Sequence, residues 1–248
     1  MNKDWFVDWF NTTYYHTLYQ HRDEGEACRF IDNLCAYLEI KKNAKILDLA
    51  CGKGRHAIHL AKKGFQTTGV DLAEKSIQIA QENALETKVD NTRFDIHDIR
   101  ETYTEKSFDY VFNLFTSFGY FEDPKENLKV LAAASGNLKS KGVFVLDFLN
   151  VQKIIPNLIP KETKYLDGIR FDIERKYNGK HIIKDIAVHD QNRTLNFQER
   201  VAAFDIHALL EMTSEVGLKV VDLFGDYDLN EFDSEKSERL ILVMKIKN

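Results

Sequence analysis

The 248-residue sequence contains only three cysteines and three prolines, and it has no excess of positive charge. Cys28, Cys35 and Cys51 are too few and too irregularly spaced for a disulfide framework or a zinc site. We therefore expect reduced thiols, a cytoplasmic location and no metal site. The formal net charge of −5 argues against nucleic acid as a partner. No run of about 18 uncharged apolar residues occurs, so no membrane span is expected.

The composition favours a packed globular protein. Hydrophobic residues make up 44% of the chain and aromatic residues 12%, which is enough for a large core. The N-terminal apolar run contains acidic residues and does not resemble a signal peptide. A chain of this length fits one large domain, or one domain with an insertion. The sequence leaves open whether the protein is a monomer or a homodimer.

Strand and helix patterns alternate through the first 150 residues. We expect residues 1–40 to be helical, because apolar residues from Ala27 to Leu38 recur at three- and four-residue spacing. This alternation predicts an α/β protein with a doubly wound, mostly parallel sheet covered by helices on both faces. The expected strands are 45–50, 66–71, 92–96, 108–113 and 143–149, and the expected helices are 55–64, 73–86 and 124–138.

A different pattern begins near residue 150. Polar and apolar residues alternate in three runs, 164–177, 180–189 and 194–203, and Asn178-Gly179 is a strong hairpin signal. We therefore predict a small, three-stranded antiparallel β insertion. The α/β pattern resumes with a helix at 206–216 and strands at 218–224 and 238–246. The predicted divisions are a helical cap (1–40), a core (41–150 and 205–248) and the insertion (151–204).

The first expected strand runs into a glycine-rich turn that begins at Ala50 and ends at Gly54. Two nucleoside cofactors bind such a turn, and the spacing to Asp71 also fits a dinucleotide. Asp48 argues against that fit, because a buried carboxylate would repel a pyrophosphate by roughly 1–4 kcal/mol at 4 Å. The two positive groups of S-adenosylmethionine would instead be attracted to it. A nicotinamide-dependent dehydrogenase stays open as an alternative.

The segment Asp48-Leu-Ala-Cys-Gly-Lys-Gly54 resembles the first motif of class I S-adenosylmethionine-dependent methyltransferases, with Ala50 in place of the first glycine. The resemblance covers about 41–150 and 205–248. It implies a Rossmann-like, seven-stranded sheet with an antiparallel final strand, and S-adenosylmethionine as cofactor. By resemblance, Asp71 would bind the ribose hydroxyls, and Asp98 with Ile99 would face the adenine. The implied cofactor-binding residues are Asp48, Ala50, Cys51, Gly52, Gly54, Asp71, Leu72, Asp98, Ile99 and Asn113.

Residues 113–121, together with Gly54-Arg55-His56, are similar to a bacterial branch of small-molecule methyltransferases with a β insertion over the active site. This similarity implies methyl transfer to an amine or hydroxyl of a small molecule. No Pro-Pro-Tyr or Pro-Pro-Phe follows Asn113, which disfavours a nucleobase substrate. A non-catalytic protein that binds a nucleoside cofactor is a further alternative.

The sequence does not decide which residue acts as a general base. The candidates are His56, Asp147, Tyr14, Tyr15 and His16, because each type of side chain can take up a proton. We expect the N-terminal aromatic residues to pack in the core rather than contact a substrate. These residues are Trp5, Phe6, Trp9 and Phe10. The insertion and residues 1–40 are predicted to form the walls of a closed substrate pocket.

Overall fold

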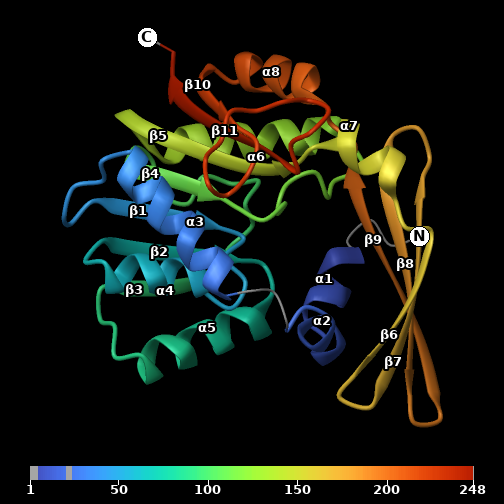
Figure 1. Cartoon of the computed structure of the whole chain (residues 1–248). Coiled ribbons are helices and arrows are strands. Elements are labelled where there is room, and N and C mark those ends of the chain that lie inside the picture. Colours follow the sequence, from blue (N-terminus) through green and yellow to red (C-terminus); the bar gives the residue numbers. More distant parts are fainter. Residues whose placement is uncertain (1–4, 21–23, 248) are drawn as a thin grey trace.

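The computed structural model describes residues 5–20 and 24–247, and its centre is a seven-stranded sheet (Figure 1). The strand order is β10-β11-β5-β4-β1-β2-β3. Strands β1 to β5 are parallel, and β11 is antiparallel to both of its neighbours, which confirms the predicted sheet. The strands are β1 (Lys45–Leu49), β2 (Gln66–Asp71), β3 (Thr92–Ile96), β4 (Phe108–Asn113), β5 (Leu138–Leu149), β10 (Leu218–Phe224) and β11 (Arg239–Ile246).

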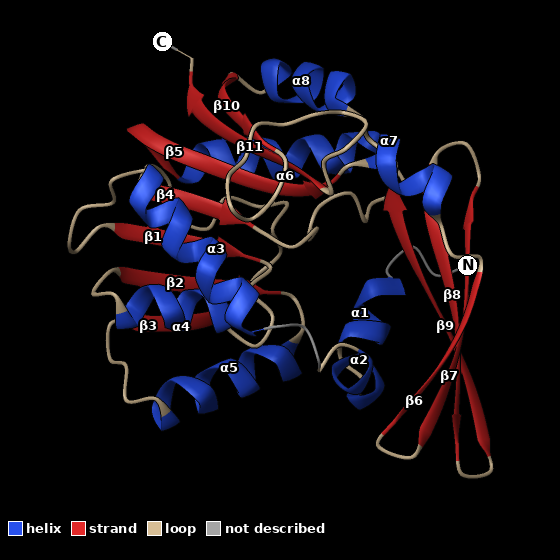
Figure 2. Cartoon of the chain, in the orientation of Figure 1, coloured by secondary structure: helices blue, strands red, loops and turns tan. Residues whose placement is uncertain are grey.

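Helices cover both faces of this sheet (Figure 2). Successive residues of a strand point to opposite faces, so Ile46 packs in the cluster beneath α3 and α4, whereas Leu47 packs against α6 and α8. Asp123 and Asp205 cap α6 and α8 by accepting hydrogen bonds from backbone N–H groups of the first turns. The helices of the core are α3 (Glu24–Tyr37), α4 (Arg55–Lys62), α5 (Glu74–Glu86), α6 (Pro124–Asn137) and α8 (Ile206–Glu215).

The insertion is a separate antiparallel sheet of four strands, not three, in the order β6-β7-β8-β9. The run predicted as one strand, 164–177, is divided by a two-residue turn at Asp167 and Gly168, whose φ angles are 51° and 79°. A short helix, α7 (Val151–Ile154), and a 3-10 turn, η1 (Ile155–Asn157), lead into it. Its strands are β6 (Lys161–Leu166), β7 (Ile169–Tyr177), β8 (His181–Asp190) and β9 (Arg193–Ala202).

The predicted N-terminal cap divides between two parts of the molecule. Helix α3 packs on the main sheet, whereas α1 (Trp5–Phe10) and α2 (Thr13–Leu18) pack against the insertion (Figure 1). Trp9 is fully buried there, and its indole donates a hydrogen bond to Glu199 of β9 at 2.7 Å. Residues 1–4 and 21–23 of the predicted cap lie outside the described residues. No helix within the described ranges is long and apolar enough to cross a membrane.

Candidate functional site

A cavity of about 310 Å³ lies at the carboxyl ends of the central strands, where α/β proteins bind ligands. Within the described chain, residues 151–204 contribute none of its lining, so the insertion does not form a wall directly. The insertion instead packs against α1 and α2, whose residues line the cavity. The core residues that line the cavity are Ala50, Cys51, Gly52, Lys53, Arg55, His56, Asp71, Leu72, Ser76, Asn83, Asp98 and Ile99. The other lining residues are Phe6, Phe10, Tyr15, His16, Tyr19, Gln20, Leu114, Phe115, Ser117, Tyr120 and Phe121.

The turn between β1 and α4 presents backbone to the cavity. Ala50, Gly52 and Gly54 all have positive φ angles, of 56°, 55° and 79°. A left-handed backbone costs alanine roughly 1–2 kcal/mol, so Ala50 is held under strain. Gly54 is the N-cap of α4 and does not line the cavity; a Cβ there would lie 2.7 Å from the ring of Phe94. The turn therefore needs its second glycine for packing.

Asp71 connects the end of β2 to this turn. One carboxylate oxygen accepts from the Gly52 backbone N–H at 2.8 Å, and the other accepts from that of Ala73 at 2.8 Å. Burial raises the pKa of Asp71, and these bonds oppose that rise. Because each oxygen of a carboxylate has a second lone pair, Asp71 can still accept hydrogen bonds from a ligand in the cavity.

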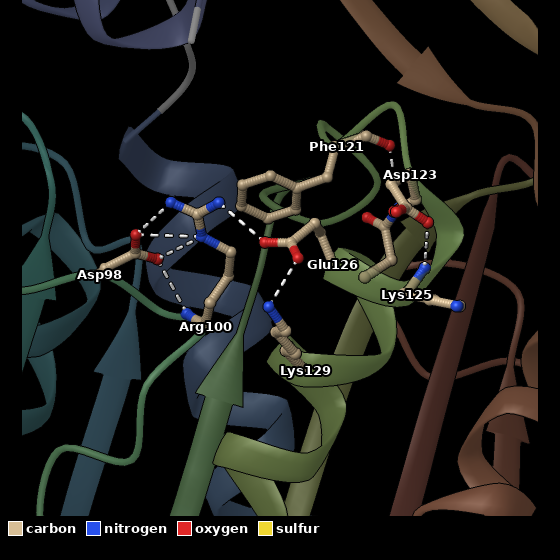
Figure 3. Close-up of polar contacts among 8 residues, drawn as sticks. Asp98, Arg100, Phe121, Asp123, Lys125, Glu126 and Lys129 are labelled. Atoms are coloured by element: carbon tan, nitrogen blue, oxygen red, sulfur yellow. Dashed lines mark hydrogen bonds and ion pairs between the residues drawn. The ribbon is translucent and has the colours of Figure 1, made fainter. Parts of the chain in front are cut away.

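Asp98, which follows β3, is held by Arg100 (Figure 3). The Arg100 Nε lies 3.0 Å from both oxygens of Asp98, and its guanidinium reaches Glu126 at 2.9 Å. The Phe121 ring covers this guanidinium with a centroid distance of 4.7 Å. Burial acts to raise the pKa of Asp98, but the bonds and charge of Arg100 outweigh it and lower the pKa. Asp98 is therefore a charged hydrogen-bond acceptor at neutral pH.

Asp48 is 2% exposed and does not line the cavity. Burial raises its pKa to about 7; the nearby Arg55 opposes this rise and Asp71 adds to it. Among the described residues, its Oδ2 has no hydrogen-bond partner. The acid therefore lies beneath the turn, from which its charge can act on a ligand, and its assignment as a cofactor-binding residue stays a prediction. Asn113 is also fully buried outside the lining, and its amide donates to the Leu49 carbonyl at 3.1 Å.

Asp147, a candidate base, instead supports a strained loop. It is fully buried, does not line the cavity, and pairs with Arg239 at 2.7 Å. Its other oxygen accepts from the Phe115 N–H at 2.7 Å, and Arg239 also donates to the Thr116 hydroxyl at 2.8 Å. Phe115 and Thr116 have φ angles of 57° and 59°. Such strain persists only where the surroundings hold it in place, and the contacts of Asp147 and Arg239 provide such support.

Three of the remaining base candidates, His56, Tyr15 and His16, line the cavity, whereas Tyr14 does not. The Tyr14 hydroxyl donates to Asp190 at the end of β8, at 2.8 Å. His56 is buried with its ring 5.0 Å from that of Phe115. Burial lowers the pKa of His16 to about 4, helped by the charges of two lysines, so its imidazole is neutral at pH 7.

Comparison with known proteins identifies the family. Residues 40–207, more than half of the chain, match the methyltransferase domain family. The chain belongs to this family. A Geobacillus sp. (strain WCH70) protein named as a methyltransferase is 28% identical over 210 residues, which cover 81% of this chain and 84% of that protein. The ubiquinone biosynthesis O-methyltransferase of Hydrogenovibrio crunogenus (strain DSM 25203 / XCL-2) is 27% identical over 186 residues, covering 68% and 75%.

The fold of this methyltransferase matches that of a solved relative. An S-adenosylmethionine-dependent methyltransferase from Clostridium acetobutylicum ATCC 824 superposes with a TM-score of 0.81 at 21% identity, covering 95% of this chain and 96% of that one. The prediction of a class I S-adenosylmethionine-dependent methyltransferase is confirmed. The residues present fit its cofactor: Asp48 has a buried oxygen with no hydrogen-bond partner among the described residues, and Asp71 and Asp98 offer acceptors in the cavity lining.

The sequence analysis missed part of the methyltransferase site. Phe6 is buried and Phe10 packs against the Trp9 cluster, as expected, but both also line the cavity, whereas Trp9 does not. The three-residue interval between Phe6 and Trp9 places them on neighbouring parts of one helix face, so the sequence pattern cannot separate the two roles. Arg100 was also missed, although its spacing from Asp98 was a signal for a local ion pair.

Proposed function

We propose that this methyltransferase methylates an amine or hydroxyl of a small molecule held between the glycine turn and helices α1 and α2. The observation that carries this proposal is that one cavity is lined both by the glycine turn with Asp71 and Asp98, and by aromatic rings of α1 and α2. We call these rings, Phe6, Phe10 and Tyr15, the roof of the cavity. Its volume of about 310 Å³ suits a small ligand rather than a polymer. The relative from Hydrogenovibrio crunogenus carries an O-methyltransferase name, which gives that protein an oxygen acceptor.

In this proposal the cofactor is held by three groups of residues. The backbone of Ala50, Cys51 and Gly52 would approach the methionine part, and Asp48 would stabilise its positive charge through space. Asp71 would accept from the ribose hydroxyls. Asp98, with the backbone of Ile99, would face the adenine. S-adenosylmethionine supplies an activated methyl group on a positive sulfur.

The protein's own contribution is alignment and exclusion of water. Helices α1 and α2 place rings over the cavity, and the insertion holds these helices through contacts such as the 2.7 Å bond from the Tyr19 hydroxyl to Glu199. His56, Tyr15 and His16 stay candidates for taking up an acceptor proton, because they line the cavity. Tyr14 and Asp147 do not. The cytoplasmic location and the monomeric or homodimeric state remain predictions of the sequence.

Calorimetric titration tests the proposal. We expect S-adenosylmethionine and its demethylated product, S-adenosylhomocysteine, to bind and NAD not to bind. Asp71→Ala should weaken binding of the product about tenfold or more, because two hydrogen bonds to a charged group are lost. The control is Asp95→Ala, which removes an acid one strand away that does not line the cavity. Equal affinity of the Asp71 variant and the native protein would refute the assigned ribose contact.

A further inference from the structure

Aromatic rings from three segments line the cavity and form what we call its aromatic wall. Phe10 and Tyr15 come from α1 and α2, and their ring centroids lie 4.8 Å apart. Tyr120, in the segment after β4, lies 5.5 Å from Phe10. Phe115 lies 5.0 Å from the imidazole of His56, and both line the cavity. Such a wall offers stacking and edge contacts to a flat, apolar ring, whereas it offers few hydrogen bonds to a polyhydroxylated molecule.

The charges around this wall are unfavourable for a positively charged acceptor. Within the described ranges, Asp71 and Asp98 provide the only carboxylates that line the cavity, and both lie at the ends of β2 and β3, where the proposed function places the nucleoside. Lys53 and Arg55 line the cavity as well. A protonated amine would therefore find no counter-ion beside the rings and would be repelled by two side-chain cations.

Glu199, an acid on β9 behind α1 and α2, is already paired with other residues. Glu199 accepts hydrogen bonds from the Trp9 indole and the Tyr19 hydroxyl, each at 2.7 Å, and forms an ion pair with Lys184 at 3.5 Å. Its side chain is 15% exposed, and it does not line the cavity. It cannot serve as the missing counter-ion without breaking the contacts that hold α1 and α2 on the insertion.

His16 supplies a hydrogen-bonding atom beside one of these rings, because its imidazole lies 5.4 Å from the ring of Tyr15. Its Nε2 is buried and has no hydrogen-bond partner within the part of the chain that the structure describes. The ring is neutral at pH 7, because burial and the charges of Lys53 and Lys75 lower its pKa to about 4. A neutral imidazole nitrogen bonds to a hydroxyl without adding charge. A buried polar atom of this kind in a cavity lining indicates a ligand partner.

We propose that the acceptor is a flat aromatic compound that binds without a positive charge and presents a hydroxyl group, as a phenol does. The aromatic wall recognises its ring, and His16 bonds to its hydroxyl. This inference rests on the proposed methyl transfer and narrows it from amines and hydroxyls to aromatic hydroxyls. Aromatic rings also attract cations; here Lys53 and Arg55 oppose that attraction in the same cavity.

The test measures binding of acceptor probes rather than turnover. Protein saturated with S-adenosylhomocysteine is titrated near neutral pH with p-cresol, 4-methylbenzylamine and glucosamine. The first two share a ring and differ in charge, whereas the third is an amine without an aromatic ring. We expect p-cresol to bind at least about tenfold more tightly than either amine, because an unpaired charge is costly to bury.

Two neighbouring tyrosines give a matched pair of variants. Tyr15→Leu removes a ring from the cavity wall and should weaken p-cresol binding about fivefold, with little change in affinity for S-adenosylhomocysteine. Tyr14→Leu removes the same group from the next position, which faces the insertion, and should leave p-cresol binding unchanged. His16→Phe should weaken p-cresol but not toluene.

The outcomes separate this inference from the proposed function. Tighter binding of either amine, no binding of p-cresol, or equal p-cresol affinity in the two tyrosine variants would overturn the aromatic-hydroxyl acceptor. These results would leave the methyltransferase function standing, provided S-adenosylhomocysteine still binds. Failure of S-adenosylhomocysteine to bind the native protein would refute the proposed function itself.

Discussion

Replacing the buried acid beneath the glycine turn should change stability and cofactor affinity in opposite directions. The pKa of Asp48 is raised to about 7 from an ordinary value of 3.8, mainly by burial. This difference means that ionising Asp48 costs about 4 kcal/mol more in the folded, ligand-free protein than in an exposed carboxyl group. Asp48→Asn removes the charge at nearly constant volume, but its amide N–H groups lack acceptors, which costs about 1–3 kcal/mol. We therefore expect the free variant to be about 1–3 kcal/mol more stable at pH 8.

The pH dependence gives an independent readout. Between about pH 4 and pH 7 the folded protein holds a proton on Asp48 that the unfolded chain has lost. The free energy of unfolding therefore falls as the pH rises through this window, and this contribution is constant above it. Asp48→Asn should lack this slope. Urea denaturation at several pH values measures it, with Asp109→Asn, an acid paired with Lys139 at the surface, as the control.

Cofactor binding should respond in the other direction. The charged form of Asp48 stabilises a positive ligand, so Asp48→Asn should bind S-adenosylmethionine at least about tenfold more weakly at pH 8. The neutral-sulfur product should lose less affinity, because only its ammonium is positive. Calorimetry at pH 8 measures both. Unchanged affinity for S-adenosylmethionine, together with an unchanged pH slope, would refute the electrostatic role of this acid.

Three further substitutions test the supports of the site. Asp147→Asn should lower the free energy of unfolding by about 3–5 kcal/mol, because it removes the charge of a fully buried carboxylate that pairs with Arg239. Glu174→Gln, at an exposed ion pair, should lower it by less than about 1 kcal/mol. Urea denaturation compares the two variants. Ala50→Gly should raise the free energy of unfolding by about 0.5–1 kcal/mol in the same assay, because glycine adopts the left-handed backbone of this position without strain. A lower free energy of unfolding would contradict the strain assigned to Ala50. Glu199→Gln should lower the free energy of unfolding by about 1–3 kcal/mol and speed amide hydrogen exchange in α1 and α2. Unaltered exchange would contradict the inference that Glu199 holds these helices on the insertion.

The main sheet was predictable because strand and helix patterns alternate along the chain, and runs such as 143–146 are short and apolar. The insertion was harder: Asp167-Gly168 is itself a hairpin signal, but it lies within a longer alternating run, and the two strands it joins keep the same alternation. Strand β5 also begins at Leu138, earlier than the predicted residue 143. Its pairing with β4 shifts register between Leu138 and Val143, so the turn expected at Gly142 is an irregularity within the strand.

The sequence motifs predicted which segments form the site, but they did not predict which side chains face the cavity. Asp48, Asp71 and Asp147 all lie at or near the ends of strands, yet only Asp71 lines the cavity. The face of the sheet to which a strand residue points depends on its place in the alternating pattern and on the helices packed on that face. A single sequence does not determine how the chain bends in the loop that follows a strand. Asp147 became a loop support only through Arg239, which lies 92 residues away.

The insertion contributes to the site only indirectly, by holding α1 and α2 in place. Because α1 and α2 carry the roof residues and the four-stranded sheet carries α1 and α2, a substitution on the inner face of that sheet would tilt the roof without touching either ligand. In the proposed arrangement, substitutions behind these two short helices would change acceptor choice without a contact to the ligand, while the part of the cavity assigned to the nucleoside keeps its shape. Divergence among such enzymes should accordingly concentrate in the scaffold behind the roof as much as in the roof itself.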